Sequence, residues 1–195
     1  PLTSIRGYAE LFRRGADHRP EDLGRIMRNI EEEAIRMGVL VDDLLLLARL
    51  DNGRPLEKAP VDLVKVVRQA VDAARFVNDQ HPLQLIADTE VRVLGDRLRL
   101  RQVVDNLLAN VRTHTSRLTR ARVVLERSGG DAVLEVIDHG PGLPAESRDR
   151  IFSRFFRADP SRSRDRGGSG LGLAIVDAIV TAHGGTITAH DTAPT

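Results

Sequence analysis

The first quarter of the chain carries a long apolar stripe with the spacing of packed helices. Along residues 20–51 the apolar positions alternate in steps of four and three for more than three heptads. These positions are Leu23, Met27, Ile30, Ala34, Met37, Val41, Leu44 and Ala48. A shorter apolar helix precedes them and stops near Gly15, and Pro20 is well placed to begin the second helix. The pattern predicts a helical hairpin in residues 1–52.

The apolar face of the second predicted helix is broader than a contact between two helices requires. Ile26, Leu40 and Leu47 widen it beyond the stripe itself. Because a lone hairpin cannot bury a face of this width, we expect two chains to pair through it as a four-helix bundle. The alternative is that this face packs against the C-terminal part of the same chain.

After residue 52 the pattern changes to alternating helices and strands. Glycine, proline and charged residues interrupt the periodicity and predict a linker at 53–61, followed by a second domain at 62–195. The predicted helices are 62–76, one that begins at Asp96, and 170–183; the predicted strands are 83–87, 91–94, 121–127, 132–137 and 186–190. The mostly polar stretch 143–167 predicts a lid. The order predicts an α+β fold, in which an α/β sandwich with a mixed sheet and helices on one face follows the hairpin.

Composition excludes several classes of function. The chain has 29 basic and 28 acidic residues among 195, so its net charge of +1 implies no polyanionic partner. With one Tyr and no Trp it has no interleaved basic and aromatic surface, and we expect no nucleic-acid partner. The absence of cysteine excludes disulfides and thiolate metal sites and fits a reducing compartment. No apolar run approaches 18 residues, so we expect no membrane contact from this segment.

Two glycine-rich segments on either side of the predicted lid indicate a nucleotide site. Residues 138–142 read D-H-G-P-G after a predicted strand, and residues 168–173 read G-S-G-L-G-L at the start of a predicted helix. A carboxylate can accept hydrogen bonds from an adenine amino group, and glycines let the backbone approach a ligand. Free N–H groups at a helix N-terminus favour phosphate. Neither segment is a Walker loop or a dinucleotide-binding G-x-G-x-x-G.

A third segment places polar side chains on one flank of an apolar helix. Asn106, Asn110 and His114 are four residues apart and therefore line up along the helix that begins at Asp96. Asparagine is a mediocre helix former, so two on one flank need a reason. A neutral amide oxygen suits a Mg²⁺ ion that is shared with phosphate oxygens and water. The alternative is an ordinary exposed polar flank.

Taken together, these segments resemble the sequence boxes of the sensor histidine kinases of two-component systems. Residues 106–115 resemble the N box, 138–142 the G1 box, 151–157 the F box and 168–173 the G2 box. Residues 1–5, which read P-L-T-S-I, resemble the end of the H box. The likeness covers nearly the whole chain and includes the ATP-binding fold shared by gyrase B, Hsp90 and MutL.

The resemblance implies ATP-dependent phosphorylation of a histidine, followed by transfer to an aspartate of a response regulator. It implies ATP and Mg²⁺ as cofactors, and a homodimer and a response regulator receiver domain as partnerships. Asp138 would hold adenine, and Asn110 would bind Mg²⁺. The other residues that would contact the nucleotide are Asn106, His114, Gly140, Gly142, Arg157, Gly168, Gly170, Leu171 and Gly172. The segment would be cytoplasmic, the soluble portion of a membrane-anchored sensor.

The chain departs from the family pattern in three places. The phosphoaccepting histidine falls five residues before Pro1, so none of the six histidines is expected to accept phosphate and no catalytic residue is assigned. Thr113 stands where the family commonly has Lys or Arg, and Arg112 points about 100° away around the helix. A final G-T-x-F strand would follow Thr195, so both ends are expected to be trimmed.

Two other readings remain open. An ATP-sensing pseudokinase or anti-sigma-like binding module would bind ATP without chemistry, and Thr113 gives it slight support. A gyrase-like or Hsp90-like ATPase would use water as the acceptor, but the helical hairpin ahead of the ATP fold disfavours it. We also expect His183, at the end of the last helix, to favour a positive charge there because of the helix dipole.

Overall fold

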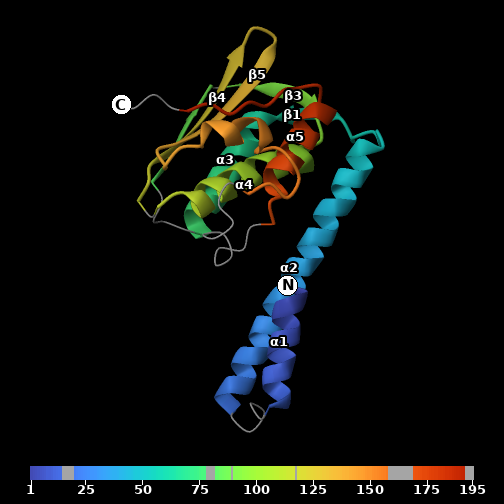
Figure 1. Cartoon of the computed structure of the whole chain (residues 1–195). Helices are drawn as coiled ribbons and strands as arrows, with labels where there is room; N and C mark the ends of the chain where they lie inside the picture. Colours follow the sequence, from blue (N-terminus) through green and yellow to red (C-terminus); the bar gives the residue numbers. More distant parts are fainter. Residues whose placement is uncertain (15–19, 78–81, 89, 117, 158–168, 192–195) are drawn as a thin grey trace. The chain divides into compact units, whose positions relative to one another are not determined.

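The computed structural model describes residues 1–14, 20–77, 82–88, 90–116, 118–157 and 169–191 (Figure 1). The chain divides into two compact units, Pro1–Ala48 and Arg49–Thr195. Residues 158–167 of the predicted lid and Gly168 lie outside the described residues.

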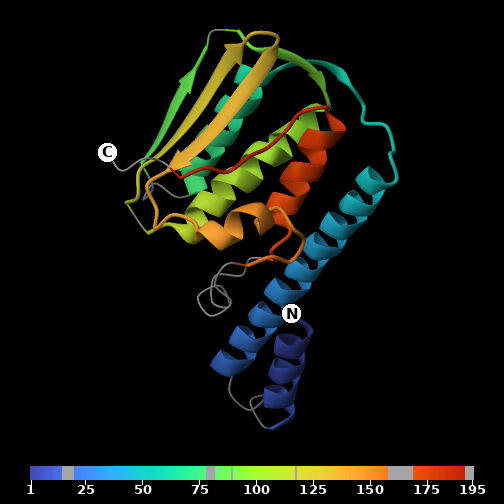
Figure 2. The same cartoon turned by 45° about the horizontal axis from the view of Figure 1, so that its top comes forward.

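The N-terminal unit is the predicted helical hairpin. Helix α1 (Leu2–Arg13) lies beside the first half of α2 (Pro20–Asp51), which has Glu21 and Asp22 in its first turn (Figures 1 and 2). These two carboxylates complement the positive end of the helix dipole. No residue of α1 is buried, and large apolar side chains remain exposed on both helices. They include Leu2, Leu11, Phe12, Met27, Ile35, Val39 and Val41. A single hairpin thus leaves much of its apolar face uncovered, although Ile26 and Leu47 are buried.

The second unit alternates strands and helices in the predicted order. It contains β1 (Ala59–Asp62), α3 (Leu63–Val77), β2 (Leu83–Ala87), β3 (Arg92–Gly95), α4 (Arg97–His114), β4 (Ala121–Ser128), β5 (Asp131–Asp138), the 3₁₀ helix η2 (Ala145–Arg150) and α5 (Gly172–Ala182). Strand β4 lies in the middle of a three-stranded sheet, parallel to β2 and antiparallel to β5. The sheet is therefore mixed, as predicted, and α3, α4 and α5 lie on one of its faces (Figure 2).

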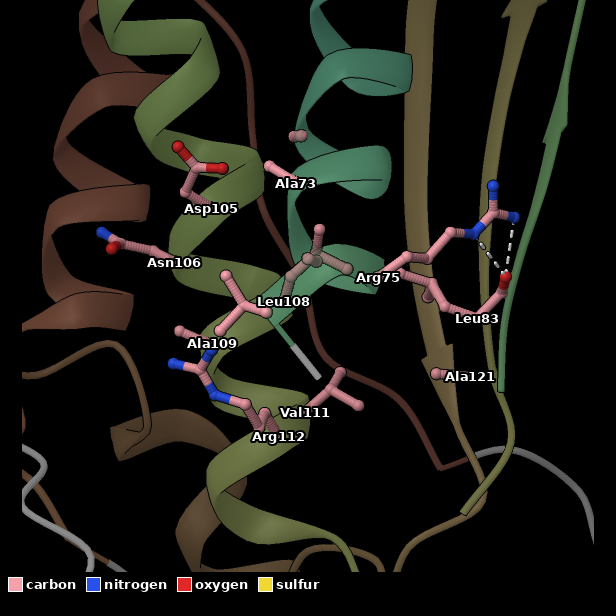
Figure 3. Close-up of a pocket in the computed structure, with 13 residues that line it drawn as sticks. Ala73, Arg75, Leu83, Asp105, Asn106, Leu108, Ala109, Val111, Arg112 and Ala121 are labelled. Carbon is pink, nitrogen blue, oxygen red and sulfur yellow. Dashed lines mark hydrogen bonds between the residues drawn. The ribbon is translucent and has the colours of Figure 1, made fainter. Parts of the chain in front are cut away.

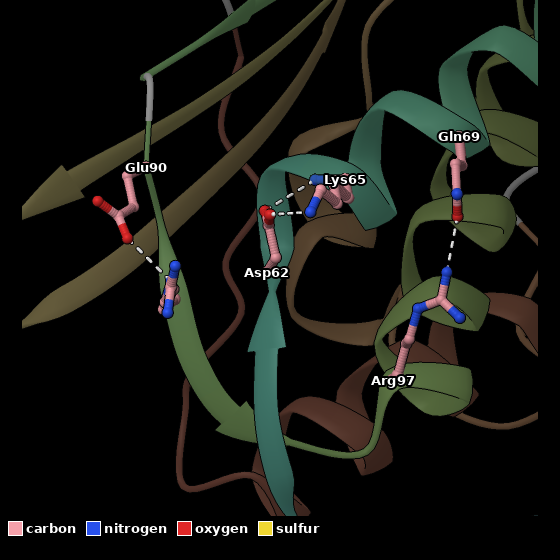
Figure 4. Close-up of polar contacts among 6 residues, drawn as sticks. Asp62, Lys65, Gln69, Glu90 and Arg97 are labelled. Carbon is pink, nitrogen blue, oxygen red and sulfur yellow. Dashed lines mark hydrogen bonds and ion pairs between the residues drawn. The ribbon is translucent and has the colours of Figure 1, made fainter.

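The core lies between this sheet and the helices. The inner face of α3 contributes Val66, Val67 and Val71, all at most 1% exposed, and β4 contributes alternate residues of its inward face. Burial of such side chains supplies most of the stability of a small domain. Asp62 caps α3 as predicted, because its Oδ1 accepts the Lys65 backbone N–H at 3.1 Å (Figure 4).

One predicted strand is absent, and one strand lies partly in the predicted linker 53–61. The predicted strand 186–190 is irregular, although Thr186, Ile187 and Thr188 suit a strand by residue type. A strand needs a neighbouring ladder of hydrogen bonds, and no backbone hydrogen bond between described residues joins 186–190 to β5 or any other strand. Conversely β1, which the sequence did not indicate, forms an antiparallel pair with β3. Pro60 lies in β1 because a two-stranded pair consists only of edge strands, where proline is tolerated.

Candidate functional site

Helix α4 carries the polar flank predicted from the sequence. Its N-terminus is capped by Asp96, whose Oδ1 accepts the backbone N–H groups of Leu98 and Arg99 at 3.0 and 3.1 Å. Asn106 is half-buried, and its Nδ2 donates to the carbonyl oxygen of Gly172 at 3.2 Å. This bond joins the N-box segment directly to the first residue of α5, 66 positions later in the sequence.

The remaining residues of the polar flank lie farther along the same helix. Asn110 is half-buried one turn beyond Asn106, and His114 is the exposed last residue of α4. The hydroxyl of Thr113 donates to the Ala109 carbonyl oxygen at 2.8 Å, within its own helix. Thr113 therefore uses its donor locally and does not replace a basic side chain.

Asp138 stands at the end of β5 and anchors the turn that follows it. Its Oδ1 accepts the backbone N–H of Gly140 at 2.8 Å, which leaves Oδ2 with no hydrogen bond from a described residue. A Cβ atom on Gly140 would lie 2.7 Å from that Oδ1 and 2.9 Å from Cγ2 of Thr115. Thr115 is buried just past the end of α4, where its hydroxyl donates to Val111. Glycine is thus required for the G1 turn to approach α4 closely.

The G2 segment is held against the F-box segment through the backbone. Phe155 donates its N–H to the carbonyl oxygen of Gly170 at 3.0 Å. Gly170 has φ +72°, and a Cβ there would lie 3.0 Å from both Cα and C of Phe155. The left-handed backbone conformation and the close approach of the Phe155 backbone therefore both favour glycine at position 170.

Helix α5 begins with backbone donors that no side chain caps. Leu171 is fully buried and anchors the helix start, but its N–H donates to the Ser169 hydroxyl at 3.2 Å. No side chain caps the N–H groups of the first turn, which starts at Gly172. Of the predicted phosphate donors, Gly172 lies in this uncapped first turn, whereas the N–H of Leu171 is already engaged.

Other predicted residues border this cluster. Gly142 has φ +75°, and a Cβ there would lie 3.7 Å from Oδ1 of Asp191, which forms an ion pair with Arg148. Arg157 is half-buried at the edge of the described part of the lid. The structure does not describe Gly168, so that prediction stays untested.

Arg112 is an exposed residue of α4. It lines a hollow of about 350 Å³ between α3, α4 and the strands β2 and β4, together with Asp105 and with Asn106 of the polar flank (Figure 3). Small side chains such as Ala73 and Ala109 leave this space open. None of its described lining residues comes from α5 or from 138–142.

The described residues of the cluster offer the amides of Asn106 and Asn110 and open phosphate donors, and no preformed cage for a metal ion. Among the described residues, no three His, Asp or Glu side chains come together as a metal site. A Mg²⁺ ion that keeps water and phosphate oxygens as ligands needs few protein ligands, and Asn110 suits that role. Within the described segments, no helix is long and apolar enough to cross a membrane.

His183 corrects one interpretation of the sequence. Its Nε2 accepts the backbone N–H of Asp96 at 3.0 Å, and its Nδ1 lies 2.8 Å from the carbonyl oxygen of Ile179. Because a backbone N–H only donates, the ring nitrogen that faces it must be unprotonated. The imidazole is therefore neutral, and the interpretation of His183 as a cation at the helix end is wrong. No local pattern indicates this contact or the one between Thr115 and Gly140, because both join residues that are distant in sequence.

Two family models match the chain. Residues 95–195 match the histidine kinase-, DNA gyrase B- and HSP90-like ATPase family, and residues 1–53 match the His Kinase A (phospho-acceptor) domain. These matches cover the G1, G2 and N-box segments and the helical hairpin respectively.

Named relatives and solved structures agree with the two family models. The chain is 49% identical to "Probable sensor histidine kinase TcrY" of Mycobacterium tuberculosis, over 96% of this chain and 40% of that protein. It is 36% identical to sensor histidine kinase CusS of Escherichia coli, over 96% of this chain and 39% of that protein. The chain thus spans about two fifths of these relatives.

Two structural comparisons extend the likeness to the fold. The structure of the mycobacterial sensor histidine kinase MprB matches with a TM-score of 0.57 and 34% identity, over 65% of this chain and 80% of that one. That of the Acinetobacter baumannii histidine kinase AdeS matches with a TM-score of 0.73 and 25% identity, over 93% and 84%.

Proposed function

The chain belongs to the sensor histidine kinases, and from that premise we propose that it binds ATP with Mg²⁺ and drives phosphorylation of a histidine. The observation that carries the proposal is the meeting of four segments that are distant in sequence. The N box contacts the G2 segment through Asn106 and the G1 segment through Thr115. The F box contacts the G2 segment through Phe155. These contacts link a carboxylate, amides and helix N–H donors along α4.

Each side of this region suits one part of the nucleotide. Asp138 keeps Oδ2 available to accept from an adenine amino group, with the Gly140 and Gly142 backbone alongside the ring. Gly170, just before α5, and Gly172, its first residue, would face the phosphates. Phosphoryl transfer depends mainly on positioning and charge neutralisation, so such a site needs few reactive side chains.

A bound Mg²⁺ would neutralise phosphate charge and orient the terminal phosphoryl group. Asn110 is the side chain that would hold it, with Asn106 and His114 beside the phosphates. Arg157 would add positive charge near the γ-phosphate from the lid side, and Gly168 would extend the row of backbone donors.

Binding of labelled ATP to Asp138→Asn tests the adenine role. The change replaces a charged acceptor, which contributes about 1.5–3 kcal/mol, so the affinity for ATP should fall roughly tenfold or more. Asp131→Asn, at the opposite and exposed end of β5, is the matched control and should bind ATP like the parent. Unchanged affinity in Asp138→Asn would remove adenine recognition from this carboxylate.

We propose that the hairpin pairs two copies of the chain. Support comes from Met27 and Val41, two positions of the predicted stripe whose side chains are 51% and 52% exposed in a single chain. Val41→Glu would bury an unpaired charge in a bundle and should yield monomers by light scattering. Arg28→Glu, an exposed polar position on the same helix, should stay dimeric. A monomeric parent at tens of micromolar would contradict this pairing.

The further partner would be the receiver domain of a response regulator, whose aspartate takes the phosphoryl group from the histidine. Because ATP and the regulator are cytoplasmic, we place this segment in the cytoplasm, as the soluble part of a membrane-anchored sensor. None of the six histidines of the chain is the proposed acceptor, so the chain with labelled ATP should not label itself. Labelling of any of the six would overturn that assignment.

A further inference from the structure

Helices α4 and α5 run antiparallel and are joined by hydrogen bonds at both ends of α5. At the start of α5 the bond is from Asn106 to Gly172. At its end the bond is from the Asp96 backbone to His183. These two bonds connect the helix that carries the N box with the helix that carries the G2 box (Figure 1).

The two connected stretches have matching lengths. From residue 96 to residue 106 an α-helix rises about 15 Å, and from 172 to 183 it rises about 16 Å. Both bonds therefore form together only in one axial register of the two helices. A slip of one residue would move the helices by about 1.5 Å and would break at least one bond.

The His183 ring is tightly constrained in this arrangement. Its Nδ1 lies 2.8 Å from the carbonyl oxygen of Ile179, one turn back in α5, which fixes this nitrogen as the one that carries the proton. Nε2 then accepts from Asp96, the residue whose side chain also caps α4. A Cβ on Gly95 would lie 2.8 Å from Cδ2 of the ring, so the imidazole rests directly against the backbone before α4.

We propose that neutral His183 is a positioning residue that sets the register of the G2-box helix against the N-box helix. The proposal rests on the proposed function, because register matters only if both helices face one nucleotide. On the proposed function, the phosphates would contact both the start of α5 and Asn110, whereas adenine would depend on Asp138 at the end of β5. Loss of register therefore weakens phosphate binding and leaves adenosine binding unchanged.

The test compares the affinities for Mg-ATP and adenosine, by calorimetry on the whole chain well below its unfolding temperature. His183→Phe fills the ring space without the acceptor and should weaken Mg-ATP binding roughly threefold to tenfold, the loss of one hydrogen bond, with adenosine unchanged. His183→Gln places a carbonyl oxygen near the position of Nε2 and should restore most of the Mg-ATP affinity. His190→Phe, which removes an exposed imidazole bonded only locally to Thr188, is the matched control.

A purely structural role of His183 gives a different result. Partial unfolding would lower the fraction of binding-competent chains for both ligands and leave the ratio of their affinities unchanged, which would overturn the proposal. Equal behaviour of the Gln and Phe variants would also overturn it.

Hydrogen exchange separates this proposal from the proposed function. The Asp96 amide should be protected in the parent and in His183→Gln, and should exchange at least several-fold faster in His183→Phe. If the parent binds no nucleotide, the proposed function fails on its own, and faster exchange in His183→Phe still reports the helix connection. If the Asp96 amide is equally protected in all variants, His183 does not set the register.

Discussion

Replacing Gly170 with alanine tests how the F box is joined to the nucleotide-binding segment. Gly170 has φ +72°, where an L-residue costs about 1–2 kcal/mol. A new Cβ would also lie 3.0 Å from Cα and C of Phe155 and from the carbonyl oxygen of Phe156. These are backbone atoms that cannot rotate away, so the bond from the Phe155 N–H to Gly170 should break, at a further cost of about 0.5–1.5 kcal/mol.

The expected destabilisation is therefore roughly 2–3 kcal/mol, and its two parts can be separated. Gly129, in the turn between β4 and β5, has φ +61° with nothing within 4 Å of its absent Cβ. Gly129→Ala therefore carries the left-handed strain alone. The difference between the two variants measures the clash with the F box, which we expect to be about 1 kcal/mol.

Urea unfolding of both variants measures the stability, and ATP titration measures the site. Gly170→Ala should unfold at lower urea concentration than Gly129→Ala with an unchanged m-value, and should bind ATP more weakly. Gly129→Ala should bind ATP like the parent because the turn is remote from the site. The reasoning is refuted if the two variants lose the same stability and both keep the parent affinity.

Three further changes test the metal role and two carboxylates. Asn110→Ala should leave the unfolding temperature nearly unchanged and remove the Mg²⁺ dependence of ATP affinity. Titration with ATP in the presence and absence of Mg²⁺ measures this dependence. An undiminished effect of Mg²⁺ would exclude Asn110 as a ligand of the ion. The Lys65 backbone N–H holds the pKa of Asp62 below its ordinary 3.8. The charged Asp62 therefore stabilises the folded state at pH values above 3.8, and this contribution is lost as the pH falls through the lowered pKa. Asp62→Asn should accordingly unfold at lower temperature than the parent at pH 7, with the difference vanishing in acid; a constant difference would contradict the linkage. Burial, with a smaller effect from Asp42, raises the pKa of Asp43, so its charged form is penalised at neutral pH. Asp43→Asn should raise the unfolding temperature at pH 7. This increase in unfolding temperature should shrink as the pH falls through the raised pKa towards 3.8. Melting curves of the parent and the variant across that pH range measure it.

The predicted fold is confirmed because most of it rests on local patterns. The four-and-three spacing in α2 and the alternation in β4 and β5 each mark one apolar face of their own element, so they are visible in short windows of sequence. The family resemblance is likewise confirmed by the matching family models. The proposed roles of individual site residues remain predictions.

The absent strand and the strand in the predicted linker show the limit of local patterns. The segment 186–190 has suitable residues but no neighbouring ladder among the described strands, while β1 contains Pro60 and still pairs with β3. A strand exists through its partner, and the partner is chosen by the tertiary fold.

The sequence by itself determined the elements and the segments that meet at the nucleotide site. Spacing of four placed Asn106 and Asn110 on one flank, and the glycines marked where backbone must approach closely. Only the tertiary structure decided that Asn106 bonds Gly172, that Thr115 abuts Gly140, and that His183 is a neutral acceptor for Asp96, 87 positions away. The reason is physical: periodicity and helix propensity act over a few residues, whereas a hydrogen-bond partner is fixed by the packing of whole helices.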